Sequence, residues 1–429
     1  MMIGNEMHEF AQELWPINRS LTGNGVRETL GRIRQYLPGL KVFEVPSGSK
    51  AFDWVVPKEW AVKSAWIKTP SGETICDFSR NNLHLVGYSV PFSGMLTLQE
   101  LQNHLFSLPD MPTAIPYVTS YYQERWGFCL SQDQRDQLKD GQYEVHIDSE
   151  LFDGHLTYGE YLVKGRLDSE VFLSTYICHP SMANNELSGP VVTSYIAKFV
   201  SELRRPRYSY RFVFIPETIG SLTYLSRNVD HLRRNVVAGF NVSCVGDERA
   251  YSYLPSRAGT TISDRVAKHV LSHIVGNYEE YGWADRGSDE RQYCAPGVDL
   301  PIATIMRSKY GRYPEYHTSL DDLETVVTPD GLLGGYKALK FAIECLEANV
   351  YPKATQLGEP QMGSRGLYPT LSTATGLSFE ERTLMDILTW SDGKHSVLDI
   401  AEKCEKPAWE IAPMVEMLVD HELLTLSDY

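Results

Sequence analysis

Between residues 157 and 348, short apolar runs alternate with stretches of helical periodicity, and this alternation constrains the fold more than any other feature. The runs VFLSTYI (171–177) and YRFVFI (210–215) are bounded by turns and are followed by predicted helices over 189–204 and 219–233. Such strands are typical of the centre of a sheet that helices cover on both faces. The pattern therefore predicts an α/β fold with a mostly parallel central sheet.

Other segments precede or interrupt this alternation. Residues 5–37 carry helical periodicity in two pieces, broken by a polar stretch over 18–25 that is either a turn between helices or a loop over a site. From 41 to 156, short apolar runs are split by Pro, Gly and Asn, which favours a β-rich unit. We therefore predict an α/β domain formed by residues 1–40 and 157–355, and a β-rich inserted domain over 41–156 that covers a cleft or makes a dimer contact.

The C-terminal segment, 365–429, has the pattern of a winged helix-turn-helix: three short helices precede the strand-like LLTL. Ser378 and Ser396 stand at helix N-cap positions, each with an acidic residue three places later. The expected recognition helix, 407–421, contains no lysine or arginine, whereas a helix that enters the major groove is normally surrounded by cations. We expect this domain to pack on protein rather than on DNA.

Charge and cysteine content limit the classes of partner and compartment. The formal net charge of −15 argues against nucleic acid and anionic membranes as partners. The seven cysteines are scattered and form no CxxC pair, as in a reduced cytoplasmic protein. The N-terminus lacks the basic and apolar parts of a secretory signal, and no long apolar run follows. We expect a cytoplasmic protein, with a homo-oligomer as the expected assembly.

Polar residues suited to catalysis follow the predicted strands, where ligands of parallel sheets collect. His179 follows the first strand, Glu217 the second, and Asp247 lies just past a third. His179 is either a metal ligand or a hydrogen-bonded loop histidine. Glu217 is either a general base, with a pKa raised by apolar surroundings, or a glutamate that interacts with a helix N-terminus.

Two later segments add further candidates. GSDERQYC (287–294) places consecutive polar side chains before a buried strand, which favours either substrate binding or a structural ion-pair network. PEYHTSLDD (314–322) offers His317 as a second imidazole, with Asp321 able to orient it.

The order of these segments resembles that of the zinc aminopeptidases and their relatives, which include glutamate carboxypeptidase and glutaminyl cyclase. The residues that carry the resemblance are His179, the NELSG turn at 185–189, ETIG at 217–220 and YHTSLD at 316–321. The whole chain resembles a bacterial aminopeptidase-like family with a C-terminal winged-helix domain. The resemblance implies that His179 and His317 bind zinc and that Glu217 is the base.

Three departures from that family argue against a centre with two zinc ions. Asn185 stands in place of the bridging aspartate, Thr218 in place of a glutamate ligand, and Ser243 in place of a further acidic ligand. Neutral side chains cannot balance two dications, so we predict one zinc ion. His179 and His317 would be joined by a carboxylate, with Glu186 as the first candidate and Asp247 as the second.

The remaining candidates are substrate contacts, with salt bridges and ordinary packing as the alternatives. They are Asn185, Arg257, Asp289, Glu290, Arg291, Tyr293, Arg307 and Tyr316. The leading hypothesis is a single-zinc hydrolase of an amide or peptide bond, acting on a small molecule or a peptide. One alternative is a deacylase or amidohydrolase acting on a sugar or natural-product intermediate. Another is a binding or assembly module without catalysis.

Overall fold

The computed structural model describes residues 2–121, 123–367 and 379–428. The chain divides into two compact units. The first contains Met1–Asp264 and Glu279–Tyr336, and the second contains Arg265–Tyr278 and Lys337–Tyr429. None of the helices within the described ranges is long and apolar enough to cross a membrane.

An eight-stranded mixed sheet forms the centre of the first unit. In spatial order its strands are β1 (Lys41–Pro46), β10 (His155–Val163), β12 (Ser209–Ile215), β11 (Glu170–Tyr176), β13 (Val236–Asn241), β16 (Ile302–Met306), β14 (Ser252–Leu254) and β15 (Glu279–Glu280). The middle strands β12, β11, β13 and β16 are parallel, and every residue of β11 and β12 is buried. The predicted α/β fold is confirmed.

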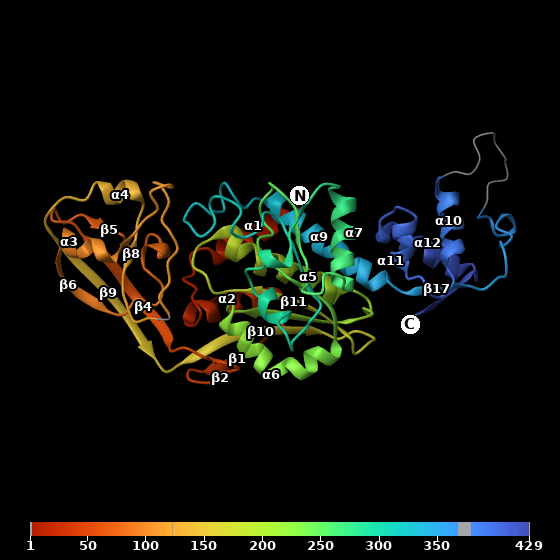
Figure 1. The fold of residues 1–429 in the computed structure, drawn as a ribbon, viewed down its shortest axis with the longest axis horizontal. Coiled ribbons are helices and arrows are strands. Elements are labelled where there is room, and N and C mark those ends of the chain that lie inside the picture. The colour runs from red at the N-terminus through yellow and green to blue at the C-terminus, as the bar shows by residue number, and fades with distance from the viewer. Residues whose placement is uncertain (1, 122, 368–378, 429) are drawn as a thin grey trace. The chain divides into compact units, whose positions relative to one another are not determined.

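Helices cover both faces of this sheet (Figure 1). The helices α1 (Met2–Leu14), α2 (Asn24–Tyr36) and α5 (Ser188–Glu202) pack together on one face, and α6 (Ile219–Asn235) lies on the other. Residues 15–23 separate α1 from α2, so the polar stretch over 18–25 ends within the first turn of α2. Two further helices, α7 (Ile262–Ile274) and α9 (Pro329–Ala348), continue from the first unit into the second.

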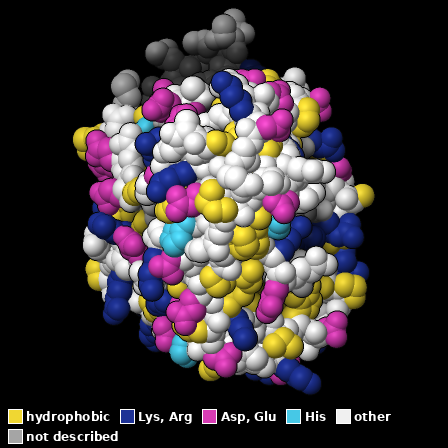
Figure 2. Space-filling view, turned by 90° about the vertical axis from the view of Figure 1, so that its left-hand side faces the viewer, with side chains coloured by type: hydrophobic (Ala, Val, Ile, Leu, Met, Phe, Trp, Pro, Cys, Tyr) yellow, Lys and Arg dark blue, Asp and Glu magenta, His cyan; other side chains and the backbone are white. Residues whose placement is uncertain are grey.

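The β-rich segment forms a second sheet with its own core. Its strands are β5 (Thr74–Ile75), β4 (Glu59–Lys68), β9 (Gln142–Phe152) and β6 (Phe92–Thr97), all paired antiparallel. Trp60, Phe128 and Tyr143 are among the buried residues beneath it. The strand β1, which the sequence assigns to this segment, pairs with β10 in the main sheet. On the face drawn in Figure 2, acidic and basic side chains are interspersed.

Besides the parts of α7 and α9, the described residues of the second unit form three short α-helices and a two-stranded sheet. The helices are α10 (Phe379–Trp390), α11 (Val397–Lys403) and α12 (Ala408–Asp420), and the strand β18 (Leu424–Ser427) pairs antiparallel with β17 (Tyr351–Ala354). The predicted capping box at Ser396 is present, with Asp399 as its partner. Ser378 lies outside the described residues.

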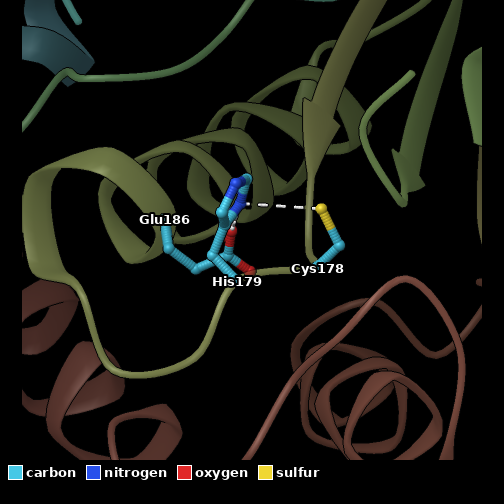
Figure 3. A group of neighbouring side chains, drawn as sticks. All are labelled: Cys178, His179 and Glu186. Atoms are coloured by element: carbon cyan, nitrogen blue, oxygen red, sulfur yellow. Dashed lines mark hydrogen bonds and ion pairs between the residues drawn. The ribbon is translucent and has the colours of Figure 1, made fainter. Parts of the chain in front are cut away.

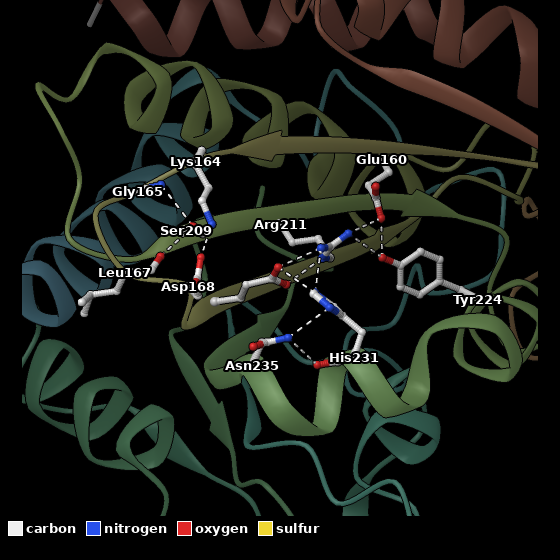
Figure 4. A network of polar contacts seen from close by, with 11 residues as sticks. Glu160, Lys164, Gly165, Leu167, Asp168, Ser209, Arg211, Tyr224, His231 and Asn235 are labelled. Atoms are coloured by element: carbon white, nitrogen blue, oxygen red, sulfur yellow. Dashed lines mark hydrogen bonds and ion pairs between the residues drawn. The ribbon is translucent and has the colours of Figure 1, made fainter.

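A charge network joins residues near the N-terminal ends of β11 and β12 (Figure 4). His179 and Glu217 follow the opposite, C-terminal ends of these strands. Arg211 donates to both oxygens of Glu170, at 2.7 and 2.8 Å, and to Glu160 at 2.6 Å. His231 of α6 approaches Glu170 at 2.9 Å, and Tyr224 donates to Glu160. The planar guanidinium matches a carboxylate with two parallel hydrogen bonds, so the network joins β10, β11, β12 and α6.

The substitution Arg211→Lys is expected to destabilise the first unit by about 1.5–3 kcal/mol. The ammonium group keeps the charge but cannot reproduce the paired hydrogen bonds to Glu170. Thermal or urea unfolding measures the effect. Lys164→Met is the control, because Lys164 pairs with Asp168 at the exposed surface and should leave stability unchanged. Equal stability of Arg211→Lys and the wild type would contradict a structural role for the network.

Candidate active site

The candidate site lies beyond the carboxyl ends of the parallel strands. His179 follows β11, Glu217 follows β12, and the loop that carries His317 follows β16. A single π-helical turn, Ala183–Leu187 (η3), leads into α5, and such turns are frequent at functional sites. Gly189 allows α5 to begin close to the sheet, because a Cβ there would lie 2.6 Å from the Val242 carbonyl oxygen.

His179 is buried and is held by Glu186 (Figure 3). Its Nδ1 lies 3.0 Å from Glu186 Oε2 and 3.6 Å from Cys178 Sγ. Burial alone would lower the pKa of His179, but Cys178, Tyr117 and Glu186 outweigh it and raise the pKa well above the ordinary histidine value. A carboxylate at Nδ1 fixes the plane of the imidazole and leaves Nε2 for another partner.

Arg19 lies beside Glu186 and belongs to the polar turn between α1 and α2. Its Nε is 3.1 Å from Glu186 Oε1, both side chains are fully buried, and it also donates to the carbonyl oxygen of His179 at 3.0 Å. Nη1 donates to the Leu14 carbonyl at 2.8 Å. Glu186 therefore directs Oε1 toward Arg19 and Oε2 toward His179 Nδ1. Of the two interpretations of the polar turn, the structure favours a loop that reaches the site.

His317 faces the same region from the opposite loop. Its ring centroid is 5.6 Å from that of His179, and Tyr316 stacks on it at 3.9 Å. Burial and the neighbouring His179 lower the pKa of His317 to about 3, so the imidazole is neutral. Its Nε2 is buried and has no hydrogen-bond partner within the described chain. A buried nitrogen with a free lone pair calls for a partner from outside the chain.

Glu217 lies next to His179, as the strand pattern predicts. Its Oε2 is 3.8 Å from His179 Nε2, and Ser288 Oγ donates to Oε1 at 2.7 Å. Burial raises the pKa of Glu217, while His179 and Ser288 oppose the rise. The following residue, Thr218, has a left-handed φ of 61°, which is rare for a β-branched residue. Backbone strain of this kind often occurs at functional sites.

The two other acidic candidates are occupied by hydrogen bonds. The backbone N–H and the hydroxyl of Ser308 donate hydrogen bonds to Asp247, at 2.8 and 2.7 Å. The backbone N–H of Arg249 also donates to Asp247, at 3.0 Å. Asp321 accepts from the N–H groups of Asn184 and Asn185, at 2.7 and 2.9 Å. Asp321 therefore anchors the turn before α5, and burial raises its pKa to about 7.

GSDERQYC forms a support for the Glu217 loop. Asp289 accepts from the Thr218 N–H at 2.8 Å and from Ser221 Oγ at 2.7 Å, and burial together with Glu217 raises its pKa to about 7. Glu290 accepts from the Gly287 N–H and from the Tyr310 hydroxyl, both at 2.7 Å. These contacts agree with a structural network at this segment.

The remaining candidates lie in different surroundings. Tyr293 is fully buried in the core and bonds to Ser174 Oγ at 2.7 Å, and Arg257 forms an exposed ion pair with Asp299. Arg307 is buried, stacks on Tyr251 and donates to the Ala250 carbonyl. Arg291 is exposed, and its guanidinium donates a hydrogen bond to the Thr218 hydroxyl at 3.2 Å. The side-chain oxygen of Asn185 accepts a hydrogen bond from the Tyr176 hydroxyl at 3.2 Å. Of this group, Arg291, Asn185 and Tyr316 lie near the histidines or Glu217.

The donor groups fit one metal ion better than two. His179 Nε2 and His317 Nε2 are the nitrogen atoms that could bind an ion, and Glu217 Oε2 lies 3.8 Å from the first of them. Asn185, Thr218 and Ser243 cannot supply the charge that a second ion needs. An ion at His179 must also displace a proton, because metal binding requires neutral imidazole.

Cys178, His179 and Glu186 form another group whose ligand atoms lie within 4.8 Å of one another (Figure 3). Burial raises the pKa of the Cys178 thiol to about 11, which keeps it protonated near neutral pH. Arg19 already supplies a positive charge to Glu186. The protonated thiol and the cationic neighbour make this group poorly suited to a dication.

Tyr117 is a residue of this region that sequence reasoning missed. It comes from the β-rich segment, and its ring lies 5.3 Å from that of His179 and 5.2 Å from that of His317. No motif marks it: Tyr117 is one of the 25 tyrosines of the chain, and it lies in a segment without catalytic patterns. Arg19 was also missed as a site residue, although it lies in the polar stretch for which the sequence left a turn between helices and a loop over a site as alternatives.

Residues 8–349 match the model of the family described as "Domain of unknown function (DUF4910)", and residues 349–426 match that of a winged helix-turn-helix. A Clostridium acetobutylicum protein named "Putative polysaccharide biosynthesis protein with aminopeptidase-like domain" is 45% identical over 424 residues, covering 99% of this chain and 96% of that protein. A crystal structure titled as a "putative peptidase" from Clostridium acetobutylicum covers 99% of this chain and 96% of its own, with 44% identity and a TM-score of 0.93.

More distant structures share the fold. A zinc aminopeptidase from Bacillus subtilis has a TM-score of 0.57 at 11% identity, with 79% of this chain and 94% of that chain covered. A peptidase M28 precursor from Shewanella amazonensis also has a TM-score of 0.57, at 14% identity and with 80% and 94% covered. The predicted resemblance is confirmed: the chain belongs to the DUF4910 family and combines an aminopeptidase-like fold with a C-terminal winged helix-turn-helix.

Proposed function

We propose that this protein hydrolyses an amide or peptide bond with the help of one zinc ion held by His179 and His317. The observation that carries the proposal is the buried, unpartnered Nε2 of His317 across from His179, with Glu217 beside it. The fold shared with zinc aminopeptidases supports it.

Each residue of the proposed site has a separate task. Glu186 accepts a hydrogen bond from His179 Nδ1 and so directs Nε2 toward the ion, which makes it an orienting group rather than a ligand. A zinc ion would polarise the scissile carbonyl and increase the acidity of a water molecule. Glu217 would accept the proton of that water at Oε2 and return it to the leaving amine, while Ser288 holds Oε1.

A deacylase or amidohydrolase acting on a sugar derivative is the second candidate function. The name of the Clostridium relative, which associates that protein with polysaccharide biosynthesis, favours it. With the same residues, a water molecule that gives its proton to Glu217 would attack the amide carbonyl of an N-acyl group. Parallel assays of N-acyl sugars and aminoacyl amides distinguish the two candidates: turnover of only one class assigns the substrate.

Purified protein supplied with zinc is expected to retain about one zinc ion per chain, and His317→Gln is expected to lose it, because the change removes one of two imidazole ligands. Elemental analysis measures the content. His146→Gln is the matched control, since His146 lies on the β-rich sheet between Ser64 and Ser93. Less than about 0.3 zinc per chain, with no hydrolysis after zinc addition, would contradict the proposal and favour a non-catalytic binding module.

A further inference from the structure

The β-rich segment reaches the two histidines of the proposed site through a short stretch, residues 115–119, which we call the strap. Pro116 forms a β-bridge with Thr318, and the Tyr117 N–H donates to the His317 carbonyl at 2.8 Å. The Ser319 N–H donates to the Ile115 carbonyl at 2.9 Å, and the Ile115 N–H donates to Ser319 Oγ at 3.0 Å. The strap therefore pairs with the His317 loop through both backbone and side chain.

The residue at the centre of this pairing has an unusual backbone conformation. His317 has a left-handed φ of 58°, which non-glycine residues rarely adopt. Such a conformation persists only where the surroundings hold it. The strap bonds to the carbonyl of His317 and to the backbone of Ser319, so it restrains the chain on the C-terminal side of the histidine.

The side chain of Tyr117 makes a second connection. Its ring meets His179 at an interplanar angle of 65° and His317 at 83°, so both contacts are edge-to-face. On the other loop, Tyr316 stacks nearly parallel to His317, with an interplanar angle of 15°. Two aromatic neighbours at such different angles leave the His317 ring little freedom to rotate, and the Tyr117 ring contacts both imidazoles.

We propose that the β-rich segment is part of the zinc site, with Tyr117 as a positioning residue that sets the planes of His179 and His317 while the strap holds the His317 backbone. This inference rests on the proposed function for its zinc ligands. A metal site depends on ligand planes being fixed before the ion arrives, and neighbours of ligands commonly change metal affinity by 10–100-fold.

The test compares Tyr117→Ala with Tyr117→Phe in the full-length protein. Alanine removes the ring and is expected to weaken zinc affinity at least tenfold, whereas phenylalanine keeps the edge-to-face contacts and should stay within about threefold of the wild type. Competition with a chromogenic chelator gives the affinities. Phe92→Ala is the matched control, because Phe92 stacks on Trp126 in the same β-rich core, away from the histidines.

A second readout does not need the metal. In zinc-free protein, the side-chain NMR signals of both histidines are expected to shift in Tyr117→Ala, because the ring current of Tyr117 is lost, and to stay near their wild-type positions in Tyr117→Phe. If wild-type protein binds no zinc but the signals behave in this way, the zinc proposal fails and the positioning role stands.

Unchanged zinc affinity and unchanged histidine signals in folded Tyr117→Ala would overturn the inference. If that variant does not fold, Tyr117→Leu keeps the apolar volume without the ring and must show the same losses. Ser319→Ala tests the strap separately: it removes the acceptor of the Ile115 N–H and should weaken zinc binding several-fold, and wild-type affinity there would overturn the backbone part of the inference.

Discussion

Replacing Glu217 by glutamine is expected to lower kcat by roughly 10²–10⁴-fold on the substrate that the wild type hydrolyses, with zinc content unchanged. Glutamine keeps the size of the side chain and can still accept from Ser288, but its amide cannot take a proton from water. The measurement is a kinetic comparison at equal zinc loading, followed by elemental analysis of both proteins.

Glu315→Gln is a suitable control for this change. Glu315 lies two residues before His317 and pairs with Arg249 near the surface, at 2.7 Å, so its loss should leave kcat within a small factor of the wild type. If Glu217→Gln loses zinc together with activity, Glu217 is a ligand rather than the base. Full activity of that variant would exclude base catalysis by Glu217.

Replacing Arg19 by methionine is expected to destabilise the first unit by about 3–5 kcal/mol and to weaken zinc binding 10–100-fold. The change leaves Glu186 as a buried charge without its cationic partner, and it removes the hydrogen bonds to the carbonyls of His179 and Leu14. Glu186 would then no longer hold His179 Nδ1 in one orientation. Chemical unfolding and chelator competition measure the two effects.

A double-mutant cycle separates these contributions. Arg19→Met combined with Glu186→Leu removes both charges and should recover part of the stability, because no unpaired charge stays buried. Zinc affinity should remain low in the double variant, since His179 has lost its orienting carboxylate. Wild-type zinc affinity in either variant would contradict the orienting role of Glu186.

The fold could be predicted because it depends on local pattern. The apolar runs that form β11 and β12 are bounded by turns, and the helices that follow have strong periodicity, so each element is specified by neighbouring residues. His179, Glu217 and His317 could be placed for the same reason, since strand ends and motif order locate them. Tyr293 shows the limit of this reasoning: it stands in a polar segment but turns into the core.

The partners of the site residues depend on contacts that no local pattern encodes. Arg19 lies 160 residues before His179, and Tyr117 meets His317 from a separate sheet. Glu186 was predicted as the first candidate for the carboxylate ligand, yet only packing decides that its oxygens face Arg19 and His179 Nδ1. The side-chain rotamers of a buried cluster depend on the packing of the whole first unit. The sequence alone therefore cannot decide whether Glu186 binds a metal or orients His179.

The wide spacing of Arg19, Tyr117, His179 and His317 along the chain has a consequence for biosynthesis. During synthesis Arg19 leaves the ribosome first, and His317 follows only some 300 residues later. Closing so long a loop is opposed by chain entropy until the packed sheet brings the ends together. A nascent chain that has not yet reached His317 therefore has no complete site, and the site assembles only when the first unit folds.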